Sequence, residues 1–154
     1  MIDAELLKGL PPAEAERVLA LGKRLLLTAG AELFHLGDAA GSLYLIARGR
    51  IRLTLPMEVR HHEEDILVEE CSSGQTVGWS ALIPPHHFTL TAAAPLETEV
   101  IALDREALNA YFAAHPDTGY AVSVNLASVI GQRLQLFQAM WLREVQRMVE
   151  LRCA

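Results

Sequence analysis

The sequence predicts a mainly β fold with flanking helices: a small antiparallel β-barrel of the jelly-roll (double-stranded β-helix) kind, with N-terminal helices and a long C-terminal helix. From residue 28 to about residue 103, short apolar runs alternate with turn residues, which is typical of antiparallel barrels and sandwiches. On both sides of this region, apolar residues recur at helical spacing. We therefore expect a single domain over residues 1–154, helical over residues 1–27, a barrel over residues 28–103 and helical over residues 104–154.

The composition narrows the class of protein. Hydrophobic residues make up 51% of the chain and charged residues 21%, as in ordinary folded proteins. The net charge of −6 disfavours broad contact with nucleic-acid phosphates, so we expect no DNA partner. No apolar run reaches the length of a membrane helix, and the N-terminus lacks the basic start of a signal peptide. Two widely separated cysteines suit a reducing compartment, and we expect a cytoplasmic protein without a membrane partner.

Two local patterns place the first elements. Pro11 and Pro12 are expected to open the second N-terminal helix, because proline fits the first turn of a helix. The clearest strand pair is predicted at 42–48 and 50–55, where apolar and polar residues alternate in the second strand. A further hairpin is expected to have its tip at 61–65.

The last helix, predicted from about Val122 to Leu151, has the most regular pattern. Its first apolar stripe, with steps of three and four residues, is the expected dimer contact: Ile130, Leu134, Phe137, Trp141, Val145 and Met148. A second stripe runs beside it: Val129, Leu136 and Met140. One stripe suffices to dock a helix on its own domain, so two stripes predict a partner helix and a homodimer. The alternative is one wide apolar face that is buried wholly in the monomer.

Several segments in order resemble the cyclic-nucleotide-binding domain family. Residues 31–38 and 42–51, AELFHLGD and SLYLIARGRI, look like that family's opening strand, Gly-Asp turn and Tyr-x-Ile-x-x-Gly hairpin. Gly37, Gly41 and Gly49 fall where such turns need a positive φ.

Two later segments extend the resemblance. Residues 74–82, GQTVGWSAL, resemble the Gly-Asp-x-Phe-Gly-Glu-x-Ala-Leu segment that leads into the family's phosphate-binding cassette. Residues 131–134, GQRL, resemble the long helix of the cAMP receptor protein/FNR branch. Regulators of that branch carry a helix-turn-helix domain after this helix, where the present sequence ends. The resemblance therefore implies a stand-alone sensor domain without a DNA-binding domain.

The cassette departs from the family at its two charged positions. The family's ribose-binding Glu is replaced by Trp79, and its phosphate-binding Arg by Phe88, or by His87 if the loop is one residue shorter. Hydrogen bonds to charged groups contribute roughly 1.5–3 kcal/mol each, so losing both costs on the order of 3–6 kcal/mol, or about a hundred- to ten-thousandfold in affinity. Phe137 stands where cAMP-responsive relatives tend to have a small hydroxyl residue. The cofactor is therefore unknown: a cyclic nucleotide is weakened as a candidate, and an apolar or aromatic ligand fits better.

The expected ligand pocket combines the cassette loop with one residue of the long helix: Val77, Gly78, Trp79, Ser80, Ala81, His87, Phe88, Thr89 and Phe137. A single helical turn over residues 80–83 would offer N–H groups to a negative charge, with His87 as a titratable donor nearby. We expect a non-enzymatic sensor or regulatory domain that signals through its long helix to a second copy or another protein.

Two alternatives stay open. In the first, Trp79 and Phe88 fill the old pocket, and the chain is a ligand-free dimerisation or docking module. In the second, a cupin-like metalloenzyme uses the histidine pairs at 61–62 and 86–87. Adjacent histidines on a strand point to opposite faces, so each pair supplies one metal ligand at most, and this pattern disfavours the enzyme.

Overall fold

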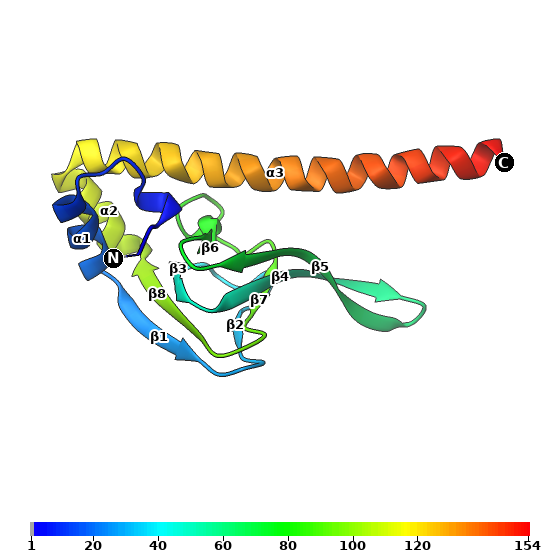
Figure 1. Ribbon diagram of the computed structural model, residues 1–154, viewed down its shortest axis with the longest axis horizontal. Helices are drawn as coiled ribbons and strands as arrows, with labels where there is room; N and C mark the ends of the chain where they lie inside the picture. The colour runs from blue at the N-terminus through cyan, green and yellow to red at the C-terminus, as the bar shows by residue number, and fades with distance from the viewer. Residues whose placement is uncertain (1) are drawn as a thin grey trace.

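The computed structural model describes residues 2–154 (Figure 1). Its elements, in chain order, are the 3₁₀ turn η1 (Glu5–Leu7), α1 (Pro12–Ala20), β1 (Lys23–Leu27), β2 (Glu32–Phe34), β3 (Ser42–Arg48), β4 (Arg50–Val59), β5 (His62–Ser72), β6 (Thr76–Val77), the 3₁₀ turn η2 (Trp79–Ala81), β7 (Thr91–Ala93), β8 (Thr98–Asp104), α2 (Arg105–Ala114) and α3 (Pro116–Cys153). The order of helices, strands and helices confirms the predicted fold class.

The strands form two four-stranded antiparallel sheets, ordered β1-β8-β3-β6 and β2-β7-β4-β5. This is a jelly-roll sandwich, and among residues 2–154 the ladders do not close into the barrel that the sequence predicted. Closure would need pairing between edge strands, and β6, with two residues, offers too short a ladder. The core lies between the sheets, where β3 and β4 bury alternate side chains such as Leu43, Leu45, Ile51 and Leu53.

The predicted hairpin of β3 and β4 is confirmed, with its turn at Gly49. This glycine has a φ of +93°, and Gly37 has a φ of +91°, both as expected. Gly41 does not adopt a positive φ, so that part of the prediction is wrong. The β4–β5 hairpin turns at Arg60 and His61, whose φ values are +48° and +72°, so its tip shares only His61 with the expected 61–65 segment.

The N-terminal helical region is shorter than predicted. Helix α1 begins at Pro12 as expected, but it ends at Ala20, and Lys23–Leu27 pairs with β8 as strand β1. Gly22 permits this change of direction, because a Cβ there would overlap the Ile101 side chain of β8. The run of three leucines in β1 carries no alternation that would have marked it as a strand.

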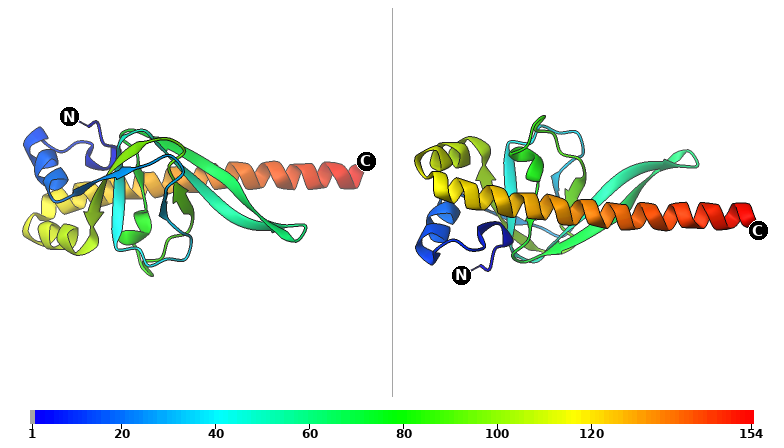
Figure 2. Two further views of the ribbon diagram at one scale, coloured as in Figure 1. Left: turned by 90° about the horizontal axis from the view of Figure 1, so that it is seen from below. Right: turned by 90° about the horizontal axis from the view of Figure 1, so that it is seen from above.

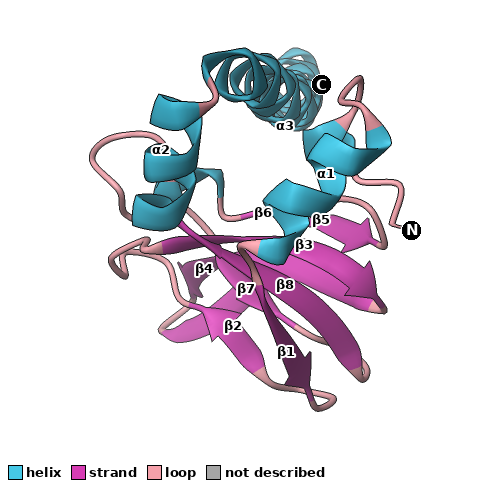
Figure 3. Ribbon diagram, turned by 90° about the vertical axis from the view of Figure 1, so that its left-hand side faces the viewer, coloured by secondary structure: helices cyan, strands magenta, loops and turns pink. Residues whose placement is uncertain are grey.

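The three α-helices lie together on one side of the strands (Figure 3). Glu14 of α1 joins them: its carboxylate accepts hydrogen bonds from the Tyr111 hydroxyl of α2 at 2.6 Å and from the Thr118 hydroxyl of α3 at 2.8 Å. Asn125 of α3 donates to the carbonyls of Leu6 and Lys8, both at 2.9 Å. These bonds fix the first turns of α3 to the N-terminal part of the chain.

Helix α3 is 38 residues long, and its second half extends past the sandwich (Figure 1). The β4–β5 hairpin projects toward the same end of the molecule and diverges from the helix (Figure 2). Despite its length, α3 is too polar to be a candidate for crossing a membrane, and no other helix of residues 2–154 is one.

Candidate ligand site and dimer helix

The cassette loop begins where β6 turns into η2. Gly78 makes this turn with a φ of +83°, and a Cβ there would stand 3.2 Å from the Phe88 ring and 3.5 Å from the Phe34 ring. The expected helical turn is present, but it starts at Trp79 and is a 3₁₀ turn of three residues. The amides of Ala81, Leu82 and Ile83 donate to carbonyls within the same turn. These N–H groups are therefore not free for an anion.

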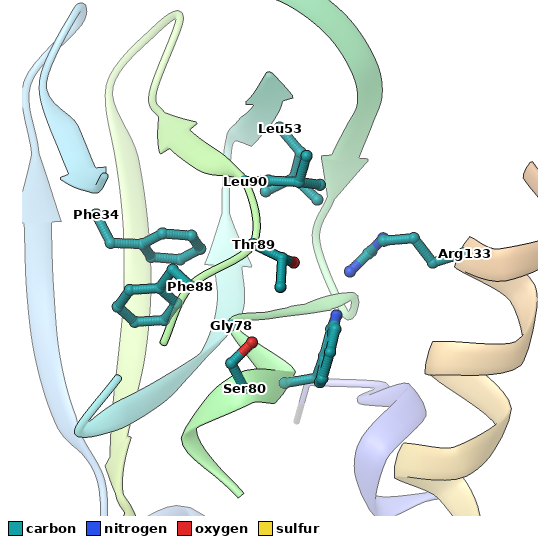
Figure 4. A pocket seen from close by; sticks show the side chains of 9 residues that line it. Phe34, Leu53, Gly78, Ser80, Phe88, Thr89, Leu90 and Arg133 are labelled. Carbon is teal, nitrogen blue, oxygen red and sulfur yellow. The ribbon is translucent and has the colours of Figure 1, made fainter. Parts of the chain in front are cut away.

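Two stacked phenylalanine rings lie beside the start of the cassette loop. Phe34 of β2 and Phe88 stack with centroids 3.8 Å apart and an angle of 11° between their planes (Figure 4). Their exposed fractions are 7% and 6%. The remaining cavity has a volume of about 10 Å³, which is at the lower limit for one water molecule. The Phe88 end of the cassette loop is therefore packed in the core.

The structure brings most of the predicted pocket residues together. Those that line the small cavity are Gly78, Trp79, Ser80, Phe88 and Thr89. Val77 and Ala81 are buried beside them in the core, and Phe137 meets Trp79 and Thr89 in an adjoining groove. His87 is exposed, and its Nδ1 bonds the Gly37 carbonyl at 3.2 Å, so it does not reach the cavity.

Arg133 of α3 is the charged residue of the site that the sequence reasoning missed. Its side chain reaches from α3 toward the cassette (Figure 4) and is 8% exposed. Its Nε donates to a Glu69 carboxylate oxygen at 2.7 Å, and its Nη2 lies 3.8 Å from the Cys71 sulfur. The sequence does contain one indication of this role: Arg133 lies between Val129 and Leu136 on the inward stripe. A charged residue on a buried face is expected to have a partner of opposite charge.

Glu69 and its neighbour Glu70 point to opposite faces of β5, as expected for adjacent residues on a strand. Glu70 bonds Arg50 and Arg52 on the exposed face at 3.1 and 3.0 Å, and these arginines lower the pKa of its carboxyl. Glu69 faces α3 instead. Within residues 2–154, Arg133 is the one α3 side chain with a hydrogen bond to a strand, so the Arg133–Glu69 ion pair is the polar link between α3 and the sandwich.

Cys71 lies next to this ion pair and is fully buried. Burial raises the pKa of its thiol to about 12, and the negative charge of Glu69 adds to the effect. A neutral buried thiol is a poor nucleophile and a poor metal ligand. Cys71 therefore serves in packing.

A shallow groove lies between the cassette loop and α3, and we call it the α3 groove. Its volume is about 170 Å³, and its walls are almost entirely apolar. The residues that line it are Trp79, Thr89, Ile130, Arg133, Leu134 and Phe137. A second groove, of about 200 Å³, borders the cassette loop at Leu82 and Ile83 and lies against α2 and α3.

The two predicted stripes of α3 have different surroundings. The second stripe turns inward, with Val129 only 5% exposed. In the first stripe, Leu134, Trp141 and Met148 are exposed by 57%, 65% and 52%, while Ile130, Phe137 and Val145 are half-buried. The alternative of one face buried wholly in the monomer is therefore wrong.

The outward face of α3 also contains an unexplained glycine. A Cβ on Gly131 would meet no atom within 4 Å, so the monomer does not require glycine here. Glycine in a helix interior costs about 1 kcal/mol relative to alanine. Gly131 lies one turn after Ala127 and one turn before Leu134 on this face, where small residues allow a second helix to approach closely.

The histidines do not form a metal centre in the part of the chain that the structure describes. No group of three or more His, Cys, Asp or Glu side chains among residues 2–154 could hold a metal ion. His86 uses its Nδ1 on the Ser80 carbonyl at 3.1 Å, and His62 lies near Glu64 on the β4–β5 hairpin.

Comparison with known proteins identifies the fold and the family. A family model described as "Cyclic nucleotide-binding domain" matches residues 24–115. The Cyclic AMP receptor protein of Thermus thermophilus is 30% identical over 137 residues, covering 88% of this chain and 59% of that protein. The chain thus spans less than two thirds of the length of this relative.

Solved structures agree with the family match. The crystal structure of Thermus thermophilus Catabolite Activator Protein aligns with a TM-score of 0.71 at 28% identity, over 96% of this chain and 62% of the other. The regulatory domain of Toxoplasma gondii PKA, a co-crystal with cAMP, aligns with a TM-score of 0.69 at 18% identity, over 84% of this chain and 46% of the other, which shows the shared fold. This chain belongs to the cyclic nucleotide-binding domain family, among proteins similar to the cAMP receptor protein.

Proposed function

We propose that this chain is a regulatory domain that works as a homodimer through α3 and does not take a cyclic nucleotide in its cassette. The observation that carries the proposal is that α3 both contacts the cassette and exposes apolar residues to solvent. The helix reaches the cassette through Arg133, and the face next to Arg133 presents exposed apolar residues such as Leu134 and Trp141. One rigid element therefore connects the candidate ligand site with a surface suited to a second helix.

The cassette supports the second half of the proposal. The resemblance places Trp79 at the position of the family's Glu, and Phe88, or His87 if the loop is one residue shorter, at that of its Arg; Phe88 is buried in a stack with Phe34. The one buried cation near the cavity, Arg133, is already paired with Glu69. A cyclic phosphate would have to displace both the aromatic stack and the ion pair, and each displacement costs free energy.

In this proposal, signalling depends on two arrangements of α3. A ligand in the α3 groove touches Ile130, Arg133 and Phe137, so it favours the arrangement in which these contacts are best. Only a difference in affinity between the two arrangements changes their populations. The names of the relatives are those of regulatory proteins, which supports a non-enzymatic role in the cytoplasm.

Light scattering on the purified chain tests the dimer. We expect a mass of twice 16.9 kDa for the wild type. Replacing Leu134 and Trp141 together by Glu should give the monomer mass, because two charges would be buried at the helix contact. Gln132→Glu, on the polar flank of the same helix, is the matched control and should remain dimeric. A wild-type monomer at the concentrations where the protein is soluble would contradict the proposal.

A ligand-free dimerisation or docking module is the second candidate, and the filled cassette cavity of about 10 Å³ favours it. Trp79→Ala separates the two functions, because Trp79 is half-buried in the wall of the α3 groove. A docking module should keep its dimer and show no ligand response before or after the change. A sensor should keep its dimer and lose its ligand response.

A further inference from the structure

Helix α3 carries an unbroken heptad pattern on its exposed face. In a heptad, lettered a to g, the residues at a and d form the contact between two paired helices. The a and d positions of α3 follow each other at alternating steps of four and three residues: Tyr120, Val124, Ala127, Gly131, Leu134, Gln138, Trp141, Val145, Met148 and Arg152. We infer that Gln138, the polar a residue in the middle of this series, selects a parallel, in-register pairing of two copies of α3. This inference rests on the proposed function, since it names the arrangement of the same dimer.

The burial of α3 within its own domain agrees with the heptad pattern. Its large, exposed apolar residues all lie at a or d, or at the flanking positions e and g: Tyr120, Val124, Leu134, Trp141, Leu142, Met148, Val149 and Leu151. Its buried residues all lie at the remaining positions b, c and f: Thr118, Gly119, Val122, Leu126, Val129 and Arg133. The domain therefore covers the b, c and f side of the helix and leaves the a and d positions to a partner helix.

Gln138 provides the specificity of the pairing. Its side-chain amide has both donors and an acceptor, so two facing Gln138 amides can hydrogen-bond to each other. Two copies of α3 bring these amides together only when they run parallel and in register. A parallel pair shifted by one heptad places Gln138 against Gly131 and Val145, neither of which has a polar side chain. A buried amide without a hydrogen bond costs free energy, so the shifted pair is disfavoured.

An antiparallel pair meets the same difficulty. In that orientation each a residue packs against a d residue of the other helix. With residues 120–152 of both copies fully overlapped, Gln138 would lie against Leu134 of the other copy and lose its hydrogen-bonding partner. Charges at e and g often select the partner and its orientation in coiled coils. Here Glu144 is the one charged residue at those positions between residues 120 and 152, so the choice rests on Gln138.

Cross-linking through a single cysteine reads the arrangement directly. In the full chain, Cys153→Ser removes the exposed native thiol, while Cys71 is buried. Met148→Cys then places a thiol at a d position, which meets its own counterpart only in a parallel, in-register pair. We expect rapid disulfide formation between two chains with oxidised glutathione. Gln146→Cys, at the exposed b position two residues away, is the matched control and should cross-link slowly. Light scattering before oxidation reports the dimer independently.

Gln138→Leu in the same Met148→Cys background tests the role of the amide. Leucine needs no hydrogen bond, so the dimer dissociation constant should fall by roughly tenfold or more. The initial rate of cross-linking should nevertheless fall by about twofold or more, because shifted and antiparallel pairs are no longer penalised. Gln132→Leu makes the same change at an exposed b position and should alter neither quantity.

Two results would overturn the inference and leave the proposed dimer standing. One is a protein of dimer mass in which Met148→Cys cross-links no faster than Gln146→Cys, and this result needs no change at Gln138. The other is a Gln138→Leu dimer that cross-links at the unchanged rate and associates no more tightly. A monomer mass for the wild type would instead contradict the proposed function, and the inference with it.

Discussion

Phe88 is the residue that anchors the end of the cassette loop in the core. Its ring stacks on Phe34, and the residue is only 6% exposed. Phe88→Ala should therefore lower the free energy of unfolding by about 3–5 kcal/mol, the usual cost of removing a buried phenylalanine ring. Urea unfolding measures this change. Thr89→Ala, at the exposed neighbouring position, should stay within about 0.5 kcal/mol of the wild type. Equal, small effects would show that the loop is not packed.

Glu14 carries the clearest pH-dependent contribution to stability. Hydrogen bonds from Tyr111, Thr118 and Arg17 lower the pKa of its carboxyl from 4.5 to about 2. Because the folded pKa lies below the unfolded pKa, this stabilisation is fully present above pH 4.5 and is lost as the pH falls toward 2. The difference in melting temperature between the wild type and Glu14→Gln should therefore shrink across this range. Thermal unfolding between pH 6 and pH 2 measures it, and a constant difference would contradict the assignment.

At the scale of single elements, α3 contains a residue, Gly131, that packing within its own domain does not require. Gly131 has no neighbour within 4 Å that would exclude a side chain. If two copies of α3 approach closely there, Gly131→Leu should separate them and shift the protein from dimer to monomer. In the absence of a partner, the same change should stabilise the helix by about 1 kcal/mol through propensity alone. Sedimentation equilibrium distinguishes these results, with Gln132→Leu as a control on the polar flank.

The elements that were predictable from sequence are those with a repeating pattern. The hairpin of β3 and β4 followed from the alternation in its second strand after Gly49, and α3 followed from steps of three and four residues. Strand β1 was missed because its leucines are consecutive, and consecutive apolar residues do not distinguish a strand from a helix. The missed elements depend on pairing partners that lie far away in the sequence.

In the candidate site, too, local motifs were predictable and contacts between distant parts of the chain were not. The cassette residues from Gly78 to Thr89 were predictable, because the resemblance rests on local motifs. Arg133 was not, since its role depends on Glu69, which is 64 positions away in the chain. The stacking of Phe88 on Phe34 could not be predicted either, because β2 and the cassette are far apart in the sequence and meet only in the folded sandwich.

At the scale of the whole molecule, α3 has a first part that is bonded to the domain and a second part that extends past it, and the cassette contacts the helix where these two parts meet. The first turns of the helix are tied to α1 and α2 through Glu14 and to η1 through Asn125. The second half of the helix runs past the sandwich (Figure 1), and Leu134, Trp141 and Met148 are exposed there. A change at the α3 groove therefore acts at the point where the helix leaves the domain, which suits transmission to a second copy.

We propose that this member of the family fills its cassette with its own side chains and does not bind a cyclic nucleotide there. Isothermal titration calorimetry of the purified chain with cAMP, and then with cGMP, tests it most directly. We predict no binding tighter than about millimolar, because two charged contacts worth on the order of 3–6 kcal/mol are missing and the cavity is filled. A micromolar dissociation constant at one site per chain would contradict the account, since it would require the Phe34–Phe88 stack to open and Arg133 to leave Glu69 for the cyclic phosphate.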